Sequence, residues 1–241
     1  ICGFCVCMLN TVVNPMLNTL GGGGNRGNQL IQTGGTLNSL TGTLTPLLVG
    51  ALIGTVTDRT AMSDVAPLLF IAMGVFAVAF VILLFVAIPE PSLRNEKAAV
   101  EDRYSAWSFR HLVLGVVAIF FYVGVEVGIP AELNFYLTDD PLCGAAIGGA
   151  VAAVYWLLMM VGRAVSATIS GKVSTRVQLS TVSLLAIVLI VVAIVMPATV
   201  RISMPGYSVA DGFGLFQVPL SALFLVLCGL CTSLMWGAIF N

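Results

Sequence analysis

Residues 89–110 read PEPSLRNEKAAVEDRYSAWSFR and hold eight charged side chains, in a chain of 241 residues with only ten basic and eleven acidic residues. Long apolar runs lie on both sides of this segment, three before it and four after it. A helix needs about 20 mostly apolar residues to cross the ~30 Å hydrocarbon core of a bilayer, and every run reaches about that length. The segment is therefore predicted to be a water-exposed linker between two groups of membrane-spanning helices.

The apolar runs predict an all-α membrane protein with seven transmembrane helices. None of the runs alternates polar and apolar residues with the period of two that a membrane β-strand requires. Residues 198–217 are predicted to form the longest loop after the linker. We expect three helices in residues 1–88, the linker at 89–110 and four helices in residues 111–241. The seven predicted spans are 1–20, 29–56, 66–88, 111–137, 144–170, 178–197 and 218–240.

The composition excludes most soluble classes of protein. Hydrophobic residues make up 59% of the chain, the mean hydropathy is +1.05 and charged residues are 9%, against about a quarter in ordinary globular proteins. A formal net charge of −1 provides no basic surface for nucleic acid. The six cysteines include the spacings Cys2-x-x-Cys5-x-Cys7 and Cys228-x-x-Cys231. His111 is the single histidine, so we interpret the cysteines as packing residues and expect no metal or cofactor.

Basic residues predict the orientation, because cytoplasmic loops hold an excess of Lys and Arg. With the linker inside, seven basic residues lie on its side of the membrane, and only Arg59 and Arg201 lie on the other. The linker is therefore expected in the cytoplasm of a multi-pass protein of the inner or plasma membrane. The chain begins at Ile1 within an apolar run, and we expect it to be a piece of a longer protein.

Amide and hydroxyl side chains recur on the first two predicted helices, where an unpartnered polar group costs on the order of several kcal/mol. Asn10, Asn14 and Asn18 are four residues apart and share a helix face. The second helix carries Asn38 and a polar stripe of Gln29, Gln32, Thr36, Ser39 and Thr43. Because amides both donate to and accept from sugar hydroxyls, we predict that Asn10, Asn14, Gln32 and Asn38 contact a substrate in a shared polar chamber. The alternative is that they join neighbouring helices in a packed bundle.

Glu126 is the sharpest single candidate, because it lies deep within the fourth span. Tyr122 precedes it by one turn, and Gly128 and Pro130 follow it. A carboxyl group at that depth could gain and lose a proton during transport. The alternative is a carboxylate paired with a residue on a helix outside this chain.

Three side chains of the fifth span complete the candidates. Tyr155 and Trp156 could stack on the apolar face of a sugar ring, or they could simply pack in the core. Arg163 lies near the inner end of the span, where its long side chain could reach the lipid headgroups. We expect Arg163 to serve as an inner gate or a topology anchor rather than as a substrate ligand.

Six short segments, taken in order, carry a resemblance to a known family. They are Asn14-Pro15 before Leu20-Gly21, Gln32 with Leu37-Asn38-Ser39-Leu40, His111 to Gly115, Tyr122 to Val127, Tyr155-Trp156 and Gly162-Arg163. With these segments the chain resembles the major facilitator superfamily, and within it the fucose, glucose and galactose:proton symporters. The resemblance implies a monomeric carrier with twelve helices in two halves, of which this chain corresponds to helices four to ten. Residues 89–110 would then be the central cytoplasmic loop.

Two positions depart from the pattern of that family. Where symporters of the fucose type have a glutamate in Glu-Thr-Ala-Ala-Asn-Pro, this chain reads Asn10-Thr11-Val12-Val13-Asn14-Pro15, and an asparagine cannot carry a proton. Gly35 stands where the family tends to have a glutamine. Proton coupling would therefore depend on Glu126 or on a residue outside this chain.

We accordingly expect alternating-access transport of a monosaccharide of the fucose, glucose or galactose class, coupled to protons. The expected partners are the sugar, the proton and the lipid bilayer. Uptake or efflux of another small organic solute remains an alternative, as does an inactive remnant of a larger carrier. No enzymatic activity is expected, because no catalytic dyad lies within the spans.

Overall fold

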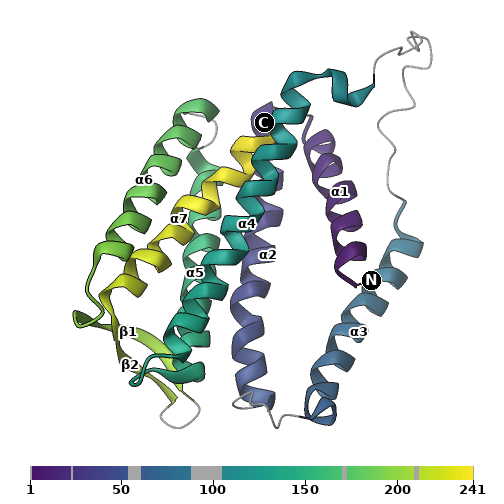
Figure 1. Cartoon of the computed structure of the whole chain (residues 1–241). Helices are drawn as coiled ribbons and strands as arrows, with labels where there is room; N and C mark the ends of the chain where they lie inside the picture. Colours follow the sequence, from purple (N-terminus) through teal and green to yellow (C-terminus); the bar gives the residue numbers. More distant parts are fainter. Residues whose placement is uncertain are drawn as a thin grey trace, which may run out of the picture.

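The computed structural model describes residues 2–22, 24–53, 61–87, 105–169, 173–208 and 212–240. Seven long helices make up most of this part of the chain (Figure 1). They are α1 (Cys2–Leu20), α2 (Gly24–Ile53), α3 (Met62–Phe85), α4 (Arg110–Thr138), α5 (Gly144–Ile169), α6 (Thr175–Val195) and α7 (Leu220–Phe240). The predicted all-α membrane architecture is confirmed. Most of the predicted linker, residues 89–104, lies outside the described residues, as do Arg59, Lys172 and Asp211.

Six of these helices are long and apolar enough to cross a membrane, and α2 is the exception. Its sequence is rich in glycine, serine, threonine and amide residues, which lower its hydropathy. Helix α2 nevertheless runs alongside α5 through much of its length (Figure 1). Part of its polar face, including Gln32 and Ser39, is therefore buried against protein.

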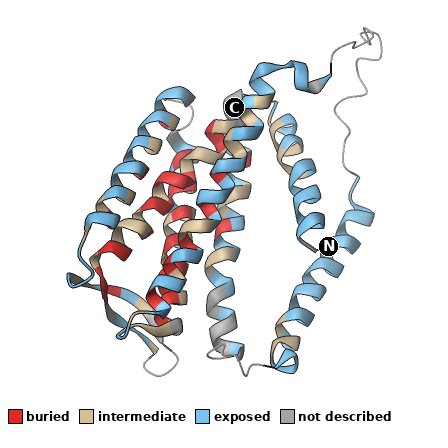
Figure 2. Ribbon diagram, in the orientation of Figure 1, coloured by how far each residue is buried: buried red, intermediate tan, exposed pale blue. Residues whose placement is uncertain are grey.

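Helices α4 to α7 pack together with α2, whereas α1 and α3 stand apart from that group (Figure 1). Helix α1 packs on α2, on the side away from α5, and α3 has no buried residue (Figure 2). Because α3 carries only apolar side chains between Ala66 and Phe85, its surface is suited to lipid contact.

A β-hairpin replaces the loop that the sequence predicts at residues 198–217. Strands β1 (Arg201–Ser208) and β2 (Gly212–Pro219) pair antiparallel between α6 and α7. Met204 and Val218 are buried in a core cluster with residues of α4, α5 and α7, while Ser203 and Gln217 are exposed. The prediction of a loop without strands was wrong here. The strands were missed because only two or three residues of each strand alternate between core and solvent. Such a short pattern is lost among the longer apolar runs.

The core lies between α5 and α7, where both helices are largely buried (Figure 2). Glycine allows this close approach: a Cβ on Gly229 of α7 would lie 2.6 Å from the carbonyl oxygen of Tyr155 on α5. We call the end of the bundle that holds β1 and β2 the hairpin end. The opposite end, where α3 finishes and α4 begins, is the linker end (Figure 1).

Candidate functional site

Arg163 is the centre of a buried polar cluster that joins three helices. Its Nη2 lies 2.6 Å from Glu126 Oε1 of α4, and the two side chains are 3% and 11% exposed. The same nitrogen donates to the hydroxyl of Tyr122, also on α4, at 3.2 Å. Nη1 donates to α2, at 2.9 Å to both the carbonyl oxygen of Gly35 and Oγ of Ser39. One guanidinium therefore connects α2, α4 and α5.

This pairing changes two expectations from the sequence. Arg163 does not extend to the headgroups; its side chain turns into the bundle and is almost fully buried. Glu126 does not depend on a helix outside the chain, because its cation is Arg163 on α5. An isolated buried charge is costly, whereas a paired and hydrogen-bonded one is tolerated. A gating role for Arg163 and a proton-coupling role for Glu126 stay predictions.

Glycine at position 35 makes room for the guanidinium. A Cβ on Gly35 would lie 3.1 Å from Cδ and 3.3 Å from Nη1 of Arg163. Gly35 is one of the two positions at which the sequence departs from the pattern expected from the resemblance, and its backbone carbonyl accepts a hydrogen bond from Arg163. The glycine at position 35 is thus explained by its contact with the guanidinium of Arg163.

The polar stripe of α2 faces α5 in part. The threonine hydroxyls of α2, inside the stripe and outside it, form hydrogen bonds with their own helix. Each of five threonine hydroxyls donates to the carbonyl four residues earlier, at 2.8–3.2 Å. They are Thr33, Thr36, Thr41, Thr43 and Thr45. Such bonds leave the hydroxyl oxygen free to accept but not to donate.

Gln32 occupies a second buried contact, closer to the linker end. Its Nε2 donates to Oγ of Ser166 on α5 at 3.1 Å, and the residue is 1% exposed. Its Oε1 has no protein partner, and neither does Oδ1 of Asn28, one turn earlier on α2. Ser166 was not among the predicted residues, although it lies three positions after Arg163 and hence near the same face of α5.

Asn38 and Trp156 meet at an open hollow between α2 and α5. The hollow has a volume of about 380 Å³ and is lined by Asn38, Thr41, Gly42, Thr45 and Trp156. Gly42 lies against the indole, since a Cβ there would be 3.1 Å from Cδ2 of Trp156. The structure thus brings together an amide, an aromatic face and two hydroxyl oxygens.

Tyr155 and the asparagines of α1 do not reach this hollow. Tyr155 is fully buried and its hydroxyl lies 3.1 Å from Oγ1 of Thr232 on α7. Asn10 is exposed and Asn14 is half-buried on α1, which lies on the far side of α2 from α5 (Figure 1). The expected chamber shared by Asn10, Gln32 and Asn38 is therefore not formed in the described part of the chain. The substrate contacts assigned to these residues stay predictions.

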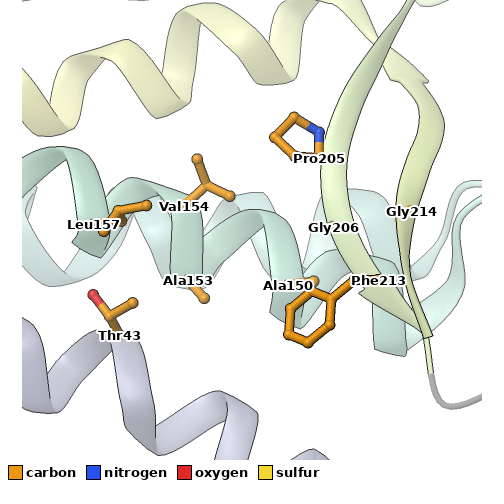
Figure 3. A pocket seen from close by; sticks show the side chains of 9 residues that line it. All are labelled: Thr43, Ala150, Ala153, Val154, Leu157, Pro205, Gly206, Phe213 and Gly214. Atoms are coloured by element: carbon orange, nitrogen blue, oxygen red, sulfur yellow. The ribbon is translucent and has the colours of Figure 1, made fainter.

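An apolar cavity lies nearer the hairpin end of the same α2–α5 contact (Figure 3). Its volume is about 250 Å³, and Thr43 is the one lining residue with a polar side chain. The other lining residues are Ala150, Ala153, Val154, Leu157, Pro205, Gly206, Phe213 and Gly214. Since a single hydroxyl oxygen stands among apolar lining groups, this cavity suits a hydroxyl-rich solute poorly.

The hairpin end is fixed by an ion pair outside the spans. Arg201 Nη2 lies 2.8 Å from Oδ2 of Asp140, in the turn between α4 and α5. Burial alone would raise the pKa of Asp140, but hydrogen bonds from Arg201 and from the backbone N–H of Leu142 outweigh it, so this pKa lies below its ordinary value. The pair attaches the start of β1 to the α4–α5 turn.

The described residues contain no group of three or more His, Cys, Asp or Glu side chains that could hold a metal ion. Cys228 and Cys231 are buried in α7, and Cys5 and Cys7 are exposed on α1. No cofactor enters the chemistry proposed below.

Comparison with known proteins finds relatives named as sugar transporters. A "Glucose/galactose transporter" of Brucella abortus is 30% identical over 196 residues, which are 78% of this chain and 47% of that protein. A "Putative glucose/galactose transporter" of Helicobacter pylori is 26% identical over 196 residues, with the same shares of both chains. The chain spans about half the length of these curated relatives. No family model and no solved structure matches the chain.

Proposed function

Because the chain is a relative of proteins named glucose/galactose transporters, we propose that it forms part of a monosaccharide carrier of the major facilitator type that works by alternating access. The chain is a multi-pass membrane protein, and its relatives are transport proteins rather than enzymes. The observation that carries the proposal is the α2–α5 contact. A buried ion cluster and a hollow with an amide and an indole both lie along this contact between the two predicted halves.

The hollow at Asn38 and Trp156 is the proposed sugar contact within this chain. An indole packs well on the C–H face of a pyranose, while an amide both donates to and accepts from adjacent hydroxyls. The side-chain oxygens of Thr41 and Thr45 can accept from further hydroxyls, because their own protons go to the helix backbone. Helices absent from this chain would supply the remaining contacts.

The ion cluster is the proposed site of proton coupling. A proton that binds Glu126 removes the charge that holds Nη2 of Arg163, so the proton and the guanidinium compete for one carboxylate. Arg163 also holds α2 through Gly35 and Ser39. Protonation of Glu126 would thereby weaken the attachment of α2 and favour movement of one half against the other.

The orientation follows from the distribution of basic residues. We place residues 89–110 in the cytoplasm and the hairpin end outside, in the inner or plasma membrane. The hollow and the ion cluster then lie within the bilayer, as expected for a carrier whose substrate binds near the midplane.

The test uses the full-length protein in liposomes. Counterflow of labelled glucose, galactose or fucose should be measured for the wild type, for Asn38→Ala and Trp156→Ala, and for Trp107→Ala as the matched aromatic control. Trp107 is 71% exposed and lies before α4. We expect the changes in the hollow to raise KM about tenfold, a loss of about 1.4 kcal/mol of binding, and the control to leave KM unchanged. Absence of counterflow with all three sugars would overturn the proposed substrate class.

A further inference from the structure

The linker ends of α2, α5 and α7 form a tightly closed seam. We define this linker-end seam as Asn28 and Gln32 of α2, Ser166 of α5 and Gly237 of α7. Asn28 is 4%, Gln32 1% and Ser166 1% exposed, and Gly237 is also buried. The seam lies at the end of the bundle at which α5 and α7 finish (Figure 1).

Gly237 is the point of closest approach within this seam. A Cβ at this position would overlap Oδ1 of Asn28 and Nε2 of Gln32, at separations below the 3.0 Å that real Cβ atoms essentially never show. Gln32 cannot easily move away, because its Nε2 donates to Ser166 on the other side. The amide of Gln32 is therefore held between the hydroxyl of α5 and the backbone of α7.

The closed seam leaves polar atoms without partners. Oδ1 of Asn28 and Oε1 of Gln32 are buried and accept no hydrogen bond. Buried amide oxygens without a donor are unfavourable, and water entering an opened seam would satisfy them. Closing therefore carries a cost that opening relieves, as expected of a contact that must form and break in each cycle.

The hairpin end of the same contact is packed more loosely. The apolar cavity is lined by Thr43 of α2 and by Ala153 and Leu157 of α5 (Figure 3). A tilt of α2 about its middle could open the linker-end seam while Thr43 moves across this cavity. The contact is thus dense and polar at one end, with free volume at the other.

We propose that Gly237 is a positioning residue for transport: its missing side chain lets α7 reach the amides of α2, and this approach closes the linker side of the carrier. The inference rests on the proposed alternating access, but it names the residue that sets the balance between the closed and open seam. A side chain at position 237 would have to displace the Gln32 amide that is bonded to Ser166, and we expect this to shift the balance towards the open state.

The test measures the seam directly and needs no sugar. Nitroxide labels at Arg26→Cys and Val177→Cys, in the full-length protein without other cysteines, report the distance across the linker end by pulsed electron resonance in liposomes. Both positions are exposed at the starts of α2 and α6. We expect Gly237→Ala to raise the ratio of the long-distance to the short-distance population about tenfold, the factor that corresponds to about 1.4 kcal/mol.

The matched control is Gly124→Ala, because nothing lies within 4 Å of the position that its Cβ would take. Equal distance distributions for Gly237→Ala, Gly124→Ala and the wild type would overturn the proposal. Asn28→Ala with Gln32→Ala removes both overlapping amides, so adding this pair to Gly237→Ala should restore the short distance. If Gly237→Ala alone yields no folded protein, recovery of folded protein by this pair supports the proposal, and no recovery overturns it.

The result is independent of the substrate assignment. A shifted distance in a protein that moves no sugar would refute the proposed substrate and keep the role of Gly237. Sugar counterflow together with an unshifted distance would keep the proposed substrate class and refute the role of Gly237.

Discussion

Replacing Arg163 with Met should destabilise the protein more than replacing Glu126 with Gln. Arg163→Met removes the hydrogen bonds to Gly35, Ser39, Tyr122 and Glu126 together, and removal of one partner from a buried ion pair costs about 3–5 kcal/mol. Glu126→Gln leaves the guanidinium with acceptors on Gly35, Ser39 and Tyr122. For this second change we expect a loss of about 1–3 kcal/mol, the cost of weakening one buried hydrogen bond to a charged group.

The two changes combined should cost less than the sum of their separate costs. With both Arg163→Met and Glu126→Gln in place, no buried charge lacks its partner. Residues that form one ion pair show coupling of about 0.5–3 kcal/mol, and the 2.6 Å separation and deep burial of this pair place it at the upper end of that range. The double variant should therefore be at least as stable as Arg163→Met alone.

Native thiols of α7 provide the assay. Cys228 and Cys231 are 0% and 2% exposed, so a thiol-reactive fluorophore labels them only when the core opens. Cys2, the exposed Cys5 and Cys7 and the half-buried Cys143 are replaced with Ser in all variants, and labelling is followed during denaturant titration in detergent. If the double variant loses the full sum of the two single losses, the two side chains act independently and the coupling argument fails.

Three further predictions follow from other parts of the structure. Glu126→Gln should abolish sugar uptake driven by a pH gradient and retain counterflow of labelled sugar; unchanged pH-driven uptake would remove this carboxyl group from the coupling. Asp140→Asn should lower Tm at pH 7, and the difference in Tm between this variant and the wild type should disappear in acid. The reason is that the folded-state pKa of Asp140 is lowered. Its pair with Arg201 therefore stabilises the protein above the ordinary carboxyl pKa of about 4, and this stabilisation is lost as the pH falls through the lower folded value. A difference that persists at pH 2 would contradict this origin. Gly229→Ala should lower the free energy of unfolding by about 1–3 kcal/mol, because its methyl group overpacks against a backbone carbonyl that cannot move aside. Gly124→Ala, measured by the same thiol assay, should not destabilise the protein. Equal effects of the two changes would argue against close α5–α7 packing.

The helices could be predicted from the sequence, because the length of an apolar run is a local property. Predicted spans such as 144–170 and 218–240 differ from α5 and α7 by at most two residues at either end. The hairpin was missed for the opposite reason: its strands are held by burial of Met204 and Val218 against α4, α5 and α7. That burial depends on residues far away in the chain, which no local pattern encodes.

The candidate site could be predicted as a set of residues but not as a set of pairs. Glu126, Arg163, Asn38 and Trp156 each stood out alone, because each is unusual within an apolar helix. Their partners depend on how α2, α4 and α5 rotate against one another, and the sequence carries no direct record of that rotation. Asn10 stood out for the same reason and is exposed on α1, a helix that lies on the other side of α2 from α5 (Figure 1).

The threonine pattern of α2 has a consequence for how this helix moves. Each of the five hydroxyl protons is bound to the backbone of the same helix, so none of these five protons loses its acceptor when a neighbouring helix, a water molecule or a sugar departs. The helix presents the same oxygen lone pairs to whatever replaces the departed neighbour. These threonines therefore cost little free energy when α2 changes its neighbours, which the proposed alternating access requires.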